Sequence, residues 1–173
     1  MAGTFIINAK TGQRIRRENF ITVLEWDNGE TTKVREAVGT RVEDSSIEYN
    51  ADIEQKRDIL GNNYTDVNGT LPQQTLDPGD LVGGSKLAEY LTMAGLTNDI
   101  DKYNNVFTVY LICKFMESDG TFFAIKHDDC SVIPSSFGGS DYLQMPYDIY
   151  FSNKITKGTV DKMGNDFTFT PAT

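Results

Sequence analysis

The order of hydrophobic and polar residues along the chain is mostly that of β-strands. Residues 20–26 are rich in β-branched and aromatic side chains, and Asp27-Asn28-Gly29 then favours a turn. Residues 46–50 alternate between polar and apolar, as do residues 167–170 in a short last strand. Residues 106–116 and 121–127 flank Asp119-Gly120, which predicts a β-hairpin.

Two of these stretches predict more than a strand. Residues 106–116 are apolar on both faces, so we expect cover from the chain's own core on one side and from a helix or a neighbouring subunit on the other. Residues 142–151 show the cleanest alternation, with Leu143, Met145 and Ile149 on the same face. Pro146 interrupts that run and cannot donate a ladder hydrogen bond, which predicts an edge strand or a bulge.

One helix is predicted over residues 86–94. Ser85 is placed to cap its first turn, Leu87 and Leu91 share one face, and Gly95 is suited to the position after the last turn. With 173 residues, the chain has the length of a single domain, 1–173. The fold class predicted is therefore mainly β (α+β), with one α-helix.

The segment from about 41 to 80 differs from the rest of the chain. It contains short alternating pieces, Gly61, Gly69 and Pro72, and few large apolar residues. Connections longer than about 12–15 residues are uncommon in compact domains and are usually functional. The pattern fits two interpretations equally well: an extended arm or hairpin that becomes ordered on a partner, or a flexible surface insertion.

Composition excludes several classes of function. A net charge of −9 disfavours a protein that grips phosphates or anionic lipid, and no run approaches the ~18 apolar residues of a membrane span. The first seven residues lack the basic lead and apolar block of a secretory signal. Cys113 and Cys130 are expected to be free thiols.

Catalytic and ligand-binding motifs are weak. His127 is the only histidine and is expected on a strand surface, which leaves Cys130 without a plausible base. The acidic pairs lack the spacing of a metal loop, and Gly83-Gly84-Ser85-Lys86 lacks that of a phosphate-binding loop. We therefore expect no catalytic residue, no metal and no cofactor, and a protein that is not an enzyme.

Charge is distributed unevenly. Between residues 25 and 66 there are eleven acidic and five basic residues, so this stretch carries six of the nine excess negative charges. A solvated face is the usual explanation, and a wall that repels polyanions is the more specific one. Lys10, Arg14, Arg16 and Arg17 form the one basic cluster, which predicts a solvated face or an ion-pair surface between subunits.

Several motifs resemble a known family. Residues 54–67, 70–78 and 83–87 are similar to the corresponding stretch of the major tail (tail tube) proteins of long-tailed bacteriophages. Pro134-Ser135-Ser136-Phe137-Gly138-Gly139, the alternation at 142–151, and Lys157-Gly158-Thr159-Val160 are similar as well. The resemblance covers nearly the whole chain and rests on turn and packing motifs.

That resemblance implies a tail-tube fold, in which two packed antiparallel β-sheets are flanked by one α-helix and a long hairpin arm extends to a neighbouring ring. It implies six copies per ring and rings stacked into a virion tail tube, assembled in the host cytoplasm. The implied partners are the chain itself, a tape-measure protein, a tail tip and a tail terminator. Double-stranded DNA would pass as non-adhering cargo, because an acidic lumen repels it, and no membrane is involved.

The residues expected to serve this role fall into two groups. Candidate lumen or ring-stacking residues are Glu48, Asp52, Asp58 and Asp66, and candidate inter-subunit or core residues are Ile59, Leu60, Tyr64, Phe107, Tyr110, Leu111 and Ile112. The alternatives are the inner tube of a contractile phage tail or phage-like injection particle, and a monomeric β-sandwich module that binds saccharide through Tyr142 and Tyr150. A small β hydrolase is the weakest alternative.

Overall fold

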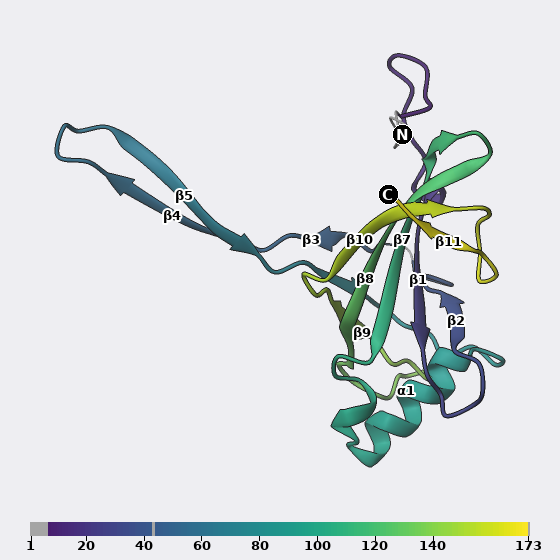
Figure 1. The fold of residues 1–173 in the computed structure, drawn as a ribbon. Coiled ribbons are helices and arrows are strands. Elements are labelled where there is room, and N and C mark those ends of the chain that lie inside the picture. Colours follow the sequence, from purple (N-terminus) through teal and green to yellow (C-terminus); the bar gives the residue numbers. More distant parts are fainter. Residues whose placement is uncertain (1–6, 43, 173) are drawn as a thin grey trace.

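The computed structural model describes residues 7–42 and 44–172, and these form a mainly β body with one α-helix and a projecting hairpin arm (Figure 1). The α-helix is α1 (Lys86–Thr97), and η1 (Arg17–Asn19) and η2 (Ile100–Lys102) are single 3-10 turns. The strands are β1 (Phe20–Trp26), β2 (Val34–Ala37), β3 (Ile47–Glu48), β4 (Ala51–Arg57), β5 (Asn63–Thr70), β6 (Gln73–Leu76), β7 (Phe107–Ser118), β8 (Thr121–Pro134), β9 (Tyr147–Tyr150), β10 (Ile155–Val160) and β11 (Phe169–Pro171). The predicted fold class, with one helix and a long hairpin arm, is confirmed.

The body consists of two antiparallel layers that share β8. The described strands pair in the order β2-β1-β7-β8-β9-β6-β3, and β10 pairs with both β8 and β11. The first half of β8, up to His127, pairs with β10, and its second half, from Ser131, pairs with β9. Asp129 lies between the halves at φ 55°, a left-handed conformation that bends the strand. The prediction that this strand ends at His127 is wrong, because the acidic pair Asp128-Asp129 marks a bend.

The main core lies between the layers and under α1. It is built from buried apolar side chains of both layers and the helix: Leu24, Trp26, Leu76, Leu87, Leu91, Phe107, Val109, Leu111, Cys130, Val132, Met145 and Ile149. Trp26, Tyr90 and Phe107 pack ring against ring with centroids about 6 Å apart at the end of β1. The helix therefore closes the open end of the two layers, as Figure 1 shows.

Both faces of β7 are buried, as its sequence predicts, but a different element covers the second face. Tyr110 and Ile112 pack in a second cluster with Val160 and Phe167, and the Tyr110 ring lies 5.0 Å from the Phe167 ring. The second face is thus covered by the chain's own C-terminal segment. The prediction that a helix or a neighbouring subunit covers it is wrong. A strand that is apolar on both faces shows that both faces must be buried. It cannot show which element buries each face.

The helix is longer than predicted. Ser85 accepts a hydrogen bond from the Ala88 amide, and Leu87 and Leu91 are buried, so the predicted start and face are confirmed. The end at Ala94 with Gly95 after it is wrong, because the helix continues to Thr97. Asn98 supplies the left-handed residue at φ 52°, and its amide bonds to the Ala94 and Gly95 carbonyls.

The predicted strand over 142–151 is shorter than its alternation. Only β9 pairs, and it begins after Pro146, so this proline marks the strand's start and the edge or bulge prediction is wrong. β9 lies inside its layer between β8 and β6. The residues before Pro146 form a loop in which Gln144 exchanges backbone hydrogen bonds with Gly138, and Leu143 is exposed.

The arm is a shorter stretch of the chain than the segment 41–80 predicted from the sequence. β3 and β6 pair with each other inside the body, through Ile47 with Gln74 and Glu48 with Gln73. Only β4 and β5 leave the body, and they form a separate two-stranded sheet that projects far from it (Figure 1). The amide of Leu71 bonds to the Tyr49 carbonyl where the arm begins.

Candidate functional site

The arm ends in a turn that is organised by one carboxylate. Asp58 accepts hydrogen bonds from the Leu60 amide at 2.9 Å, the Asn62 amide at 2.8 Å and the Asn62 side chain at 3.0 Å. These bonds, with the Asn62 side chain contributing most, lower the pKa of Asp58 below its ordinary value. Gly61 takes φ 87° in the same turn. The tip is therefore a defined loop, although it lies on the surface.

Two large apolar side chains occupy this tip without cover. Ile59 is fully exposed at 103% of its reference area, and Leu60 is 82% exposed. Single apolar residues scattered over a protein surface are ordinary. Two adjacent ones at the end of a projecting hairpin form a small exposed apolar patch. The sequence singled out both residues, and the structure places them where a partner can reach them.

The two faces of the hairpin differ in chemistry. Residues opposite each other in the register share a face, so Glu54 and Asp66 lie with Lys56 on one side, whereas Ile53 and Val67 lie on the other. The Lys56 ammonium is 2.8 Å from Glu54 and 3.3 Å from Asp66, so this charged face satisfies its own ions. The opposite face exposes Ile53 at 56% and Val67 at 62%. That face also carries the polar pairs Gln55/Thr65 and Arg57/Asn63, so its apolar part is the Ile53–Val67 pair alone. Sequence reasoning missed this pair because it requires the strand register.

The structure separates the predicted acidic residues. Glu48 is exposed on β3 in the body, whereas Asp52, Asp58 and Asp66 all lie on the arm. Asp52 accepts a hydrogen bond from Asn68 at 3.3 Å, and Asp66 pairs with Lys56. The structure therefore does not bring the four carboxylates together at one site.

The predicted inter-subunit or core residues also separate. Four of them, on β7, belong to the core of a single chain, with exposed fractions of 9% or less: Phe107, Tyr110, Leu111 and Ile112. The other three lie on the arm and are exposed: Ile59, Leu60 and Tyr64. Only the arm residues are available to another molecule.

A second surface with uniform character lies on the layer β3-β6-β9-β8. Its inward row, Ile47, Gln74, Ile149 and Val132, packs into the core, so the flanking rows of the register face outward. The outward side chains include Glu48 and Asp148, and the strands of this layer carry no lysine or arginine at 47–48, 73–76, 131–134 and 147–150. Asp148 accepts hydrogen bonds from Thr75 at 2.5 Å and Ser135 at 3.2 Å. The charged side chains of this face are acidic, and Ile133 and Tyr150 are exposed beside them.

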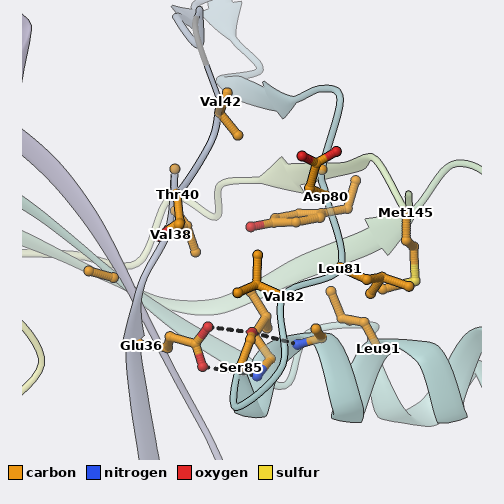
Figure 2. Close-up of a pocket in the computed structure, with 16 residues that line it drawn as sticks. Glu36, Val38, Thr40, Val42, Asp80, Leu81, Val82, Ser85, Leu91 and Met145 are labelled. Atoms are coloured by element: carbon orange, nitrogen blue, oxygen red, sulfur yellow. Dashed lines mark hydrogen bonds between the residues drawn. The ribbon is translucent and has the colours of Figure 1, made fainter. Parts of the chain in front are cut away.

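The glycine-rich turn before α1 is occupied by a carboxylate of the chain. A small hollow of about 120 Å³ lies between β2, the loop 79–82 and α1, and Figure 2 shows Glu36 reaching the helix start across it. Glu36 accepts hydrogen bonds from the Ser85 hydroxyl at 2.5 Å and the Leu87 amide at 3.1 Å. A negative charge at a helix N-terminus is stabilising, so the position a phosphate would take is already filled.

The residues weighed above for catalysis have structural roles. His127 is buried at 7% exposure, so its predicted surface position is wrong; its Nδ1 lies 3.0 Å from the Ser152 carbonyl and its ring packs edge-on to Phe151. Cys113 and Cys130 are buried free thiols, and burial raises the pKa of Cys113 to about 11.

The tyrosines considered for saccharide binding do not form a platform. Tyr142 and Tyr150 are exposed, but they lie on a loop and on β9, and none of the ring contacts between described residues joins them. In the described part of the chain, no helix is long and apolar enough to cross a membrane.

Comparison with known proteins finds similarity to solved structures and none to protein families or curated sequences. No protein-family model matches the chain, and no curated protein matches it. A chain of the sheath–tube complex of an extracellular contractile injection system in the extended state is similar at 16% identity and a TM-score of 0.44, over 85% of this chain and 93% of that one. The tube-terminating cap of the anti-feeding prophage is similar at 18% identity and a TM-score of 0.44, over 85% and 92%. A sheath/tube terminator chain of an extracellular contractile injection system is similar at 19% identity and a TM-score of 0.44, over 84% and 96%.

Proposed function

We propose that the chain is the structural subunit of a phage-like tail tube, which it builds by forming six-membered rings that stack. The observation that carries this proposal is the β4–β5 arm. An isolated two-stranded hairpin is at best marginally stable in water, and this one lies away from the body with its apolar tip and the Ile53–Val67 pair exposed. A second copy of the chain is the partner that would cover it, which agrees with the resemblance to major tail proteins in 54–67.

In this proposal, the difference between the two faces of the arm decides which face contacts the next ring. The face with Ile53 and Val67, together with Ile59 and Leu60 at the tip, lies against the next ring and buries the apolar area. The face with Glu54, Lys56 and Asp66 stays in water, because Lys56 already pairs with both carboxylates and the three side chains keep a net negative charge. Burying that ion cluster would cost desolvation without a new partner. Asp52, Asp58 and Asp66 accordingly belong to the ring-stacking region of the proposed tube.

The acidic layer β3-β6-β9-β8 supplies the lumen in this proposal. Glu48 and Asp148 project from it, and the parts of the strands that form this layer, 47–48, 73–76, 131–134 and 147–150, hold no lysine or arginine to offset them. Duplex DNA carries one negative charge per about 1.7 Å of its axis, so an acidic wall repels it and a basic wall would hold it. The tube then serves as a passage for the genome during ejection, with a tape-measure protein, tail tip and terminator as further partners.

Removal of the arm tests the proposal. Residues 52–69 are replaced by Gly-Gly, which keeps the pairing of β3 with β6 and the bond between Leu71 and Tyr49. A deletion that continued to residue 75 would also remove the buried Gln74 from β6 and would unfold the body. We expect concentrated wild-type protein to form rings and tubes in negative-stain micrographs, and the shortened protein to remain folded without forming tubes.

A matched pair of point variants separates the apolar tip from the rest of the arm. Ile59→Ser with Leu60→Ser removes the apolar tip, whereas Glu54→Ser with Asp66→Ser changes two exposed residues on the face that stays in water and serves as the control. Tubes should be lost in the first variant and retained in the second, with unchanged circular dichroism in both. A wild-type chain that stays monomeric at every concentration would contradict the proposed function.

A further inference from the structure

We propose that copies of this chain meet head to tail through opposite charges at the two ends of β1, in addition to the contact made by the arm. The inference rests on the proposed function, since it names the surfaces through which rings would stack. It starts from the strand itself: β1 runs from Phe20 at one end of the body to Trp26 at the other, beside α1 (Figure 1).

The end that precedes Phe20 is basic. Lys10, Arg14, Arg16 and Arg17 all lie on the exposed segment before β1, and the Asn8 side chain ties this segment to the Glu117 carbonyl at the same end of β7. Arg17 has a local role, because it donates hydrogen bonds to the Phe20 and Ser45 carbonyls. Lys10 and Arg14 have no ion-pair partner among the described residues. Among the described residues before β1 and at this end of the β7–β8 hairpin, Lys114 adds a fifth cation, and the carboxylates are those of Glu18, Glu117 and Asp119.

The end that follows Trp26 is acidic. Asp27 and Glu30 lie in the connection to β2, and Asp99 and Asp101 lie between α1 and β7. The same connection holds one cation, Lys33, which pairs with Glu25 at 3.8 Å. Asp99 and Asp27 both lie near Tyr90, since both charges add to burial in raising the pKa of its hydroxyl above the ordinary value. Lys102 pairs with Asp99 at 3.7 Å, which leaves Glu30 and Asp101 exposed without an ion-pair partner in the described chain.

Distance keeps the two ends from neutralising each other within one chain. A seven-residue strand spans roughly 20 Å, whereas salt screens exposed charges beyond about 8 Å at physiological ionic strength. Two surfaces that are complementary and lie on different parts of one molecule give a head-to-tail contact that repeats. Such charge pairs set the orientation and register of an encounter more than its strength. In a stack of rings, they would align each ring in the same direction as the one below it.

Charge reversal at each end tests this inference. Variant one carries Lys10→Glu and Arg14→Glu, so both of its ends are acidic; variant two carries Glu30→Lys and Asp101→Lys, so both of its ends are basic. All four side chains are exposed and lack an ion-pair partner within the described residues, so both variants should fold. Each alone should need a protein concentration about tenfold higher to form tubes, because every copy in a ring loses its axial pairs. An equimolar mixture should restore assembly, since acidic ends then meet basic ends in alternation.

The control has the same change in charge away from β1. Lys154→Glu with Lys157→Glu alters two exposed side chains just before and on β10, which β7 and β8 separate from β1, and it should leave tube formation unchanged. If wild-type protein forms tubes and both end variants form them equally well, this inference is wrong and the proposed function stands. If the wild-type chain forms no rings or tubes, both fail. If variant one forms tubes normally but loses retention of added duplex DNA, the basic end is a nucleic-acid contact and the inference is overturned.

Discussion

Thr22 and Gln74 are 52 positions apart in sequence, yet the Thr22 hydroxyl donates a 2.9 Å hydrogen bond to the Gln74 side-chain oxygen inside the core. Both residues are almost fully buried, and the Gln74 amide nitrogen donates in turn to the Ser45 hydroxyl at 3.0 Å. Thr22 belongs to β1 and Gln74 to β6, so this chain of hydrogen bonds links the two layers where no strand pairing joins them.

Removal of one partner of this link should destabilise the body. Thr22→Val keeps the shape of the side chain but leaves the Gln74 oxygen buried without a donor, which costs about 1–3 kcal/mol. The free energy of unfolding from urea titration measures the loss. Thr22→Val combined with Gln74→Met removes both polar groups, and it should recover part of the stability; a double variant less stable than Thr22→Val would contradict this account.

The helix start should depend on Glu36. Glu36→Ala removes the acceptor of the Ser85 hydroxyl and the Leu87 amide, and we expect a loss of about 1–2 kcal/mol in the free energy of unfolding. Glu89→Ala, on the exposed face of the same helix, is the matched control and should change the stability little, because its 4.0 Å pair with Lys86 is solvent-exposed. Equal losses in the two variants would show that Glu36 does not anchor the helix.

Stability should fall in alkaline solution through two buried groups. Burial, with a smaller effect of the Glu25 charge, raises the pKa of Tyr110 to about 12, and burial raises that of Cys113 to about 11. Unfolding returns these pKa values toward 10.0 and 9.0, so the unfolded chain releases protons first and the contribution of both groups is lost as the pH rises from about 9 to 12. Unfolding titrations at pH 7, 9 and 10.5 should show the decline. Cys113→Ala should make it smaller without abolishing it, because burial also raises the pKa of Cys130 above 9.0.

Gly158 should be required for the C-terminal strand to dock. A Cβ at this buried position would collide with the Thr170 carbonyl oxygen and would lie 2.6 Å from the Phe169 ring, so Gly158→Ala must displace β11. Limited proteolysis of the variant should cut within residues 161–172, which wild-type protein protects. Gly83→Ala is the control, since its Cβ would meet no atom within 4 Å. Equal protection in both variants would contradict the prediction.

Local patterns were enough to predict most elements, and the misses have physical causes. β1, the β7–β8 hairpin and the start of α1 follow from side-chain types and turn residues close in sequence. The ends of β8 and α1 were misplaced because Asp129 and Gly95 look like stops, whereas tertiary contacts continue both elements past them. Gly95 stays helical beside Pro134, whose ring would lie 3.6 Å from a Cβ at the glycine position.

The candidate site was likewise predicted only in part from the sequence. The polar, turn-rich pattern was sufficient to mark 41–80 as unusual, and Ile59 and Leu60 were among the candidates for the role that the resemblance implies. It could not show that Glu54 and Asp66 flank Lys56 while Ile53 and Val67 share the other face, since this follows from a register that slips at Asp52.

By itself, the sequence determined a mainly β chain with one helix, an acidic excess and a long atypical segment, because these depend on composition and on short-range periodicity. Only the tertiary structure decided that β8 bends to serve both layers and that the C-terminal segment covers Tyr110 and Ile112. It also decided that Asp99 lies near Tyr90 at the same end of β1 as Asp27. These features depend on contacts between residues far apart in sequence, and such contacts leave no periodic signal in a single chain.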